Sequence, residues 1–136
     1  MHPPPTVLDD LLPSHLMFPV RRLLLQTPRT NEVLAAEVEE YRQAVSKAYA
    51  TGSWPDMDHD LAMDCATQCL ALLERFPMPT PAESALLHVA CRYFVISDDD
   101  EDDFESMVGF DDDALVVNAC ARALGAADLA IALTPR

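Results

Sequence analysis

The fold is decided by one stretch of this 136-residue chain, Thr80-Pro-Ala-Glu-Ser-Ala-Leu-Leu-His-Val-Ala-Cys-Arg-Tyr-Phe-Val-Ile96. Thr80 is a good N-cap, Pro81 suits the first helical position, and Glu83 completes a capping box. Apolar residues then recur at helical spacing over a wide face, which predicts a central, buried helix: Leu86, Leu87, Ala90, Cys91, Phe94 and Val95. His88 on this helix is expected to be partly buried with a hydrogen-bond partner, and a catalytic role is the alternative.

Amphipathic segments flank this helix on both sides. Asn31 is the expected N-cap of the first of them, and Gly52 supplies its stop. Half of the residues are hydrophobic, no strand-like alternation occurs, and the chain has only three glycines. The sequence therefore predicts an all-α bundle of four to five helices. Besides the central helix, we expect helices over 31–50, from near 55 to 76, from 111 or 112 to 125, and over 126–133.

Residues 1–30 hold six prolines, which deny this region a long regular element. We expect an arm that packs over the core and contains a short helix over 16–26. A partner-binding amphipathic segment that uses Arg21 and Arg22 is the alternative. Residues 31–136 are expected to form a single helical domain.

The charge balance is strongly acidic and uneven. The chain holds 23 Asp and Glu against 9 Lys and Arg, a formal net charge of -14. Such a surface repels phosphate, so nucleic acid and anionic lipid are not expected as direct partners. Ten of the carboxylates fall within residues 98–113, called the acidic segment below, which contains no basic residue. The rest of the chain has an ordinary charge balance.

Several features predict a cytoplasmic protein. The N-terminus lacks a basic region followed by an apolar one, which a secretory signal would show. The best apolar stretch, residues 85–96, is too short and too polar to span a bilayer, so no integral membrane segment is expected. The four cysteines lie among apolar neighbours, as reduced and buried cysteines do, and zinc ligation is the alternative: Cys65, Cys69, Cys91 and Cys120.

Part of the acidic segment stands where local electrostatics disfavour it. Residues 98–103 follow the C-terminal end of the central helix, where the helix dipole is negative, whereas residues 111–113 suit the start of the next helix. Carboxylates at this density repel one another, so the segment needs arginines, a cation or solvent. An EF-hand does not account for it, because registers from Asp98 and from Asp99 both lack the required glycine and glutamate.

The stretch from Tyr93 to Val117 resembles the signature of the YkvA-like family of small helical bacterial domains. The resemblance covers about residues 86–124 and is carried by eight spaced identities: Tyr93, Ser97, Asp99, Asp103, Phe104, Gly109, Asp112 and Asp113. Three prolines of the family pattern are replaced here by Asp98, Asp102 and Ser106. The resemblance implies a divergent member of a family generally described as being of unknown function.

Four of the matched carboxylates would converge if the acidic segment folded back between its two helices, and they form the candidate metal ligands: Asp99, Asp103, Asp112 and Asp113. A hard, oxygen-ligated Ca²⁺ or Mg²⁺ is the functional interpretation. Helix capping together with pairing to Arg92 or Arg122 is the structural one. A second metal hypothesis places His59 with Asp60 and Asp64.

We therefore predict a small acidic interaction or adaptor protein rather than an enzyme. Its acidic segment would engage a basic protein partner, because complementary charge speeds association and sets specificity. The expected contacts are Asp98, Asp100, Glu101, Asp102 and Glu105.

Two alternatives belong to other functional classes. One is a divalent-cation-binding protein or metal-dependent hydrolase that uses the four candidate ligands, with His88 or His59 as base. The other is an acidic immunity protein or nucleic-acid mimic.

Overall fold

The computed structural model describes residues 7–53, 55, 57–96 and 110–131. Every regular element among them is helical, which confirms the all-α prediction. The elements are α1 (Val7–Leu11), η1 (Ser14–Leu16), α2 (Met17–Leu24), α3 (Asn31–Ala50), α4 (His59–Arg75), α5 (Pro81–Val95), α6 (Asp111–Ala123) and η2 (Ala127–Leu129). Within these ranges, no helix has both the length and the apolar character needed to cross a membrane.

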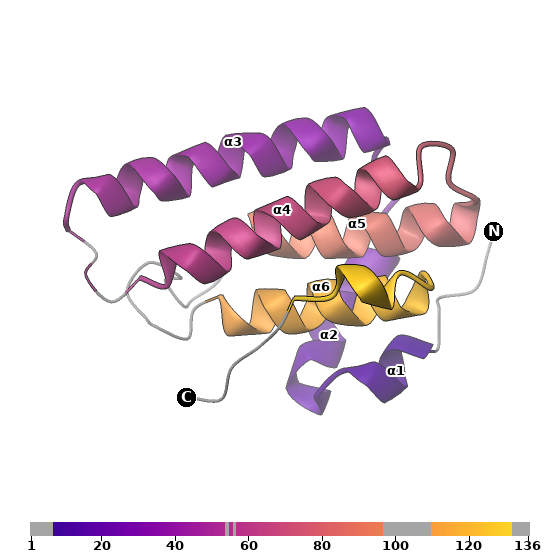
Figure 1. The fold of residues 1–136 in the computed structure, drawn as a ribbon. Coiled ribbons are helices and arrows are strands. Elements are labelled where there is room, and N and C mark those ends of the chain that lie inside the picture. The colour runs from indigo at the N-terminus through magenta and orange to yellow at the C-terminus, as the bar shows by residue number, and fades with distance from the viewer. Residues whose placement is uncertain (1–6, 54, 56, 97–109, 132–136) are drawn as a thin grey trace.

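The four longest helices form the bundle. The axes of α3, α4, α5 and α6 run roughly along one direction, and α3 lies at the top of Figure 1. Helix α5 contacts α2, α3, α4 and α6, as expected for the central helix. Its apolar face is buried, and Leu87 and Phe94 are fully inaccessible to solvent.

The start of α5 has the capping box that its sequence predicts. The Thr80 hydroxyl accepts the Glu83 N–H over 3.2 Å, and the Glu83 carboxylate accepts the Thr80 N–H over 2.9 Å. Two otherwise unsatisfied backbone donors are thereby paired at the start of the central helix.

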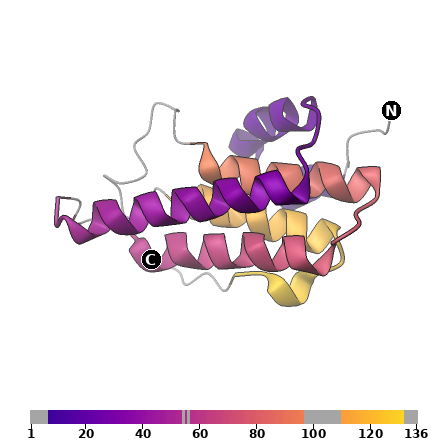
Figure 2. The same cartoon turned by 90° about the horizontal axis from the view of Figure 1, so that it is seen from above.

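The proline-rich arm packs onto the bundle as an integral part of the core. Helix α2 contacts α5 and α1 contacts α6, so both cover one side of the bundle (Figure 2). The arm contributes five buried apolar side chains to the same core cluster as the long helices: Leu8, Leu12, Leu16, Val20 and Leu23.

Several helix boundaries differ from the sequence-based expectation for local reasons. Thr30, not Asn31, caps α3, since its hydroxyl accepts the Val33 N–H over 3.3 Å. The Asn31 amide instead donates to the carbonyl of Phe76 over 2.7 Å and thereby ties α3 to the end of α4. Helix α4 begins only at His59, because the Asp58 carboxylate caps it through the Leu61 N–H.

The C-terminal end of α6 shows a second difference. Gly125 has a φ of 76°, and the Ala126 N–H bonds to the Ala121 carbonyl over 2.8 Å, which ends the helix in a Schellman motif. Only a short 3-10 turn, η2, follows where a longer helix was expected. Residues 132 and 133 of that expected helix lie outside the described residues.

Candidate functional site

The acidic segment meets the described structure at the start of α6. Asp111 and Asp112 are half-buried, and Asp113 is buried with 3% of its surface exposed. All three lie in the first helical turn, where free backbone N–H groups favour negative charge. The N-cap itself is Phe110, which makes no side-chain cap and is completely buried, so the three aspartates follow the N-cap position.

Asp112 has a contact that sequence reasoning missed. Its carboxylate lies 3.3 Å from Nε2 of His15, which precedes α2 on the N-terminal arm. Both side chains are substantially exposed, at 44% and 63%. The contact therefore brings the start of α2 to the acidic start of α6.

The other candidate ligands and contacts fall outside the described residues. These are Asp99 and Asp103 of the metal hypothesis, and Asp98, Asp100, Glu101, Asp102 and Glu105 of the partner hypothesis. Among the residues that the structure does describe, no group of three or more His, Cys, Asp and Glu side chains is arranged to hold a metal ion. His59, Asp60 and Asp64, the residues of the second metal hypothesis, are described and form no such group.

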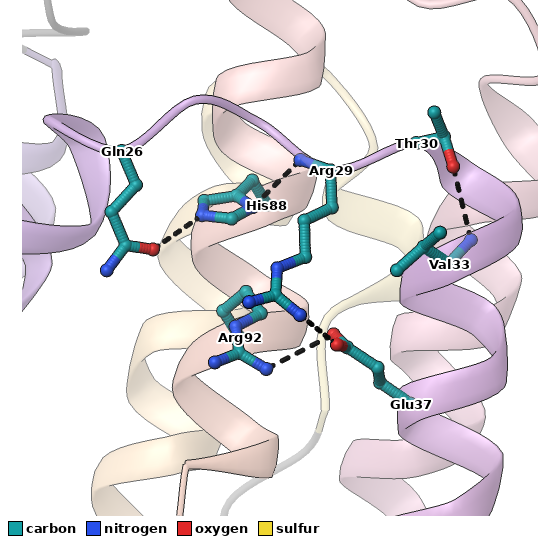
Figure 3. A network of polar contacts seen from close by, with 7 residues as sticks. All are labelled: Gln26, Arg29, Thr30, Val33, Glu37, His88 and Arg92. Carbon is teal, nitrogen blue, oxygen red and sulfur yellow. Dashed lines mark hydrogen bonds and ion pairs between the residues drawn. The ribbon is translucent and has the colours of Figure 1, made fainter.

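Arg92, a candidate counter-charge for the acidic segment, contacts α3 within the described residues. Its Nη1 donates to Glu37 Oε1 over 3.2 Å, and the other Glu37 oxygen pairs with Arg29. Glu37 therefore bridges two arginines, one before α3 and one on α5 (Figure 3). The pair of Glu37 and Arg92 is largely shielded from water, because these side chains are only 24% and 20% exposed, whereas Arg29 is 42% exposed.

His88 lies beside this bridge and is 1% exposed. The backbone N–H of Arg29 donates to Nδ1 over 3.2 Å, so the proton of the neutral ring is on Nε2. That Nε2–H donates to Gln26 Oε1 over 3.0 Å (Figure 3). The predicted hydrogen-bonded and buried histidine is confirmed, and both of its nitrogens are occupied.

The surroundings of His88 disfavour its protonated form. Burial is the main cause of its lowered pKa, and the charges of Arg92 and Arg29 lower it further. A proton on Nδ1 would also face the Arg29 N–H, so that two donors would oppose each other. The neutral ring thus serves as a fixed hydrogen-bond connector between α5 and the chain that leads from α2 to α3.

The second histidine of interest, His59, lies at the start of α4. Its Nε2 is 3.2 Å from the Ser46 hydroxyl, and its ring stacks on Tyr49 with centroids 4.5 Å apart. The Asp60 carboxylate is 3.9 Å from Nδ1, beyond hydrogen-bond distance, and that side chain is fully exposed. Ser46, His59 and Asp60 are the residue types of a catalytic triad, but Asp60 does not orient the histidine ring as a triad requires.

The four cysteines form a buried thiol cluster that spans α4, α5 and α6. A hydrogen bond with Cys91 and burial raise the pKa of Cys69 well above its ordinary value. Burial, together with the carboxylate of Asp113, does the same for Cys65. These thiols are therefore neutral packing groups, in agreement with the core interpretation of their sequence positions.

Two polar features were not anticipated from the sequence. Asn118 is buried in α6, donates to the carbonyl of Ile131 over 2.9 Å and accepts its N–H over 2.6 Å. Glu37 looks like one of several surface glutamates of α3 in sequence. Asn118 is a single polar residue within the apolar run 114–121, which was an available signal, whereas the role of Glu37 depends on where Arg92 is placed in space.

No family model, curated protein or solved structure matches this chain. The fold and its described side chains define the class of the protein as a small all-α helical bundle.

Proposed function

We propose that the protein is a small interaction protein whose acidic segment engages a basic protein partner. One observation carries the proposal: ten carboxylates and no basic residue fall within residues 98–113, which follow the central helix α5 and extend into the first turn of helix α6. The described end of this segment includes Asp112, whose side chain is 44% exposed. Charge at this density attracts a cationic surface from a distance and favours rapid association.

The two histidines considered as catalytic bases, His88 and His59, support an interaction role over catalysis. Both nitrogens of His88 are engaged within the protein, so this ring has no free position for a substrate proton. The Asp60 carboxylate, 3.9 Å from Nδ1 of His59, is too far away to orient that ring by a hydrogen bond. The proposal also accords with the resemblance to YkvA-like domains, which by itself assigns no reaction.

The test is an affinity capture from lysate of the source cells, quantified by mass spectrometry at low and high salt. One variant neutralises the proposed contacts by Asp98→Asn, Asp100→Asn, Glu101→Gln, Asp102→Asn and Glu105→Gln. The matched control removes the same charge from exposed positions elsewhere, by Asp10→Asn, Glu32→Gln, Glu40→Gln, Asp64→Asn and Glu74→Gln.

We expect basic proteins to be captured at low salt by the wild type and by the control, and to be lost at high salt and from the first variant. Equal recovery on all three chains would refute the proposal. Calorimetric titration with Ca²⁺, Mg²⁺ and Mn²⁺ distinguishes it from the cation-binding alternative, since millimolar or tighter binding that Asp99→Asn together with Asp103→Asn abolishes would favour a metal site.

A further inference from the structure

The outer face of α2 presents an exposed stripe of two large apolar residues and two arginines. Phe18 and Leu25 are 70% and 83% exposed, and Arg21 and Arg22 lie between them and are also exposed. These positions have the spacing i, i+3, i+4 and i+7, which places all four on one helical face. Leu25 keeps helical geometry, because its N–H bonds back to the carbonyls of Arg21 and Arg22. We call these four residues the α2 stripe.

The helix that carries the stripe is firmly held from its other side. Val20 and Leu23 on the opposite face are buried in the core, and α2 packs along α5. The Arg22 guanidinium lies 5.9 Å from the centre of the Phe18 ring, within the range of a cation–π contact. The stripe is therefore preorganised, which reduces the entropy lost when a partner binds it.

We propose that the α2 stripe docks an amphipathic helix of a partner protein, one whose apolar residues are flanked by carboxylates. The spacing of the anchors fits such a partner: Phe18 and Leu25 are about 10 Å apart along the axis, or two turns of a facing helix. The exposed guanidinium of Arg22 between them calls for Asp or Glu on the flank of that helix. The chain carries a net charge of -14, so it repels an acidic partner at long range. The α2 stripe is complementary to such a partner only locally, within about a Debye length.

Charge argues against two other occupants. A second copy of this chain joined symmetrically through α2 would bring the arginines of both copies together, and each copy carries the same large negative charge. An anionic membrane would extend beyond α2 to the acidic start of α6, which the contact between His15 and Asp112 places beside the start of α2. A single helix can cover the stripe and avoid those carboxylates.

The test is a selection from a displayed library of helical peptides on the intact chain. Peptides that bind the wild type are expected to carry Leu, Ile or Phe at helical spacing, flanked by Asp or Glu. Their affinities, measured by fluorescence anisotropy, should weaken at least about tenfold in Phe18→Ala and in Leu25→Ala, and similarly in Arg22→Glu. Met78→Ala is the matched control, because Met78 is 92% exposed in the turn between α4 and α5, away from the stripe.

Several results would overturn the proposal. The selection could enrich no such peptide, or the peptides it enriches could still bind the Phe18 and Leu25 variants. Phosphatidylglycerol vesicles that bind in a Phe18-dependent way would point to a membrane instead, and a Phe18-dependent dimer in sedimentation equilibrium would point to a second copy of the chain. Far-ultraviolet circular dichroism and a thermal midpoint close to the wild type show that each variant is folded, as expected for exposed side chains. Neutralising residues 98–105 should leave this binding intact, so its outcome is independent of that for the acidic segment.

Discussion

His88 Nε2 on α5 donates a hydrogen bond to Gln26 Oε1, just beyond α2, over 3.0 Å. The two residues are 62 positions apart in sequence, and the contact fixes the end of the N-terminal arm on the central helix. Together with the bond from the Arg29 N–H to Nδ1, it satisfies both nitrogens of a ring that is almost inaccessible to water. The protonation state of one buried side chain is thereby linked to the docking of the arm.

The first prediction is that the protein loses stability as His88 is forced to accept a proton. Burial lowers the pKa of His88 in the folded chain, whereas the unfolded chain keeps the ordinary value of 6.5. Below that pH the unfolded state binds more protons, so the free energy of unfolding falls with decreasing pH, by at most about 1.4 kcal/mol per pH unit. Above it, this contribution is fully present.

Urea titrations of the wild type and of His88→Gln between pH 5 and 7.5 measure this effect. Glutamine can accept or donate at this position but does not titrate. We expect the stability of the wild type relative to the variant to decline as the pH falls below about 6.5. A difference that is constant over this range would contradict the prediction.

The second prediction concerns the bridge between α3 and α5. Glu37→Gln removes the charge that pairs with Arg29 and Arg92, and leaves the largely shielded Arg92 and the more exposed Arg29 without that charge between them. We expect a loss of about 1 kcal/mol in the free energy of unfolding, between the contribution of an exposed ion pair and that of a buried hydrogen bond to a charged group. Chemical denaturation measures it, and Glu40→Gln on the exposed side of α3 is the control. Equal stabilities of the two variants would show that the bridge contributes nothing.

How much of this arrangement could be predicted depends on the range of the interactions involved. The capping box at Thr80 and the buried face of α5 follow from residues close in sequence, and both are confirmed. The bounds of α3 were also predictable, although Thr30 outcompetes Asn31 as its cap because the Asn31 amide finds the Phe76 carbonyl on α4. Neither the Glu37 bridge nor the partner of His88 could be found this way, because each joins segments more than 50 residues apart.

For the candidate site, too, local features could be predicted from the sequence and long-range ones could not. Composition locates the acidic segment without any structure, and helix dipoles explain why residues 111–113 suit the start of α6. The α2 stripe required the structure, since the sequence 17–25 is apolar and basic throughout and does not reveal which apolar residues face the core. The structure separates Val20 and Leu23, which are buried, from Phe18 and Leu25, which are exposed.

The third prediction is that the four thiols are inert in the native protein. All are buried, and burial raises the pKa of Cys65 and of Cys120. Reaction with a disulfide reagent such as Ellman's requires a thiolate and access, so the folded chain should react at least about a hundredfold more slowly than the unfolded chain. The absorbance of the released thiolate measures both rates, with and without denaturant. Stoichiometric reaction of any cysteine within the mixing time would contradict this expectation.

The fourth prediction concerns how Asn118 anchors the C-terminal end of the described chain. Its amide pairs with both the N–H and the carbonyl of Ile131, as a neighbouring strand would, and all of these groups are buried. Asn118→Ala would leave two backbone groups without partners, at an expected cost of about 1–3 kcal/mol in the free energy of unfolding. Because an isolated break affects only the attachment of this end, amide hydrogen exchange of Ile131 should accelerate more than that of α5 residues.

Asn118→Asp tests the same contact differently, since a carboxylate can still accept the Ile131 N–H but opposes its carbonyl. Native-state exchange by nuclear magnetic resonance measures each effect, and uniform acceleration over the whole chain would refute a local anchoring role.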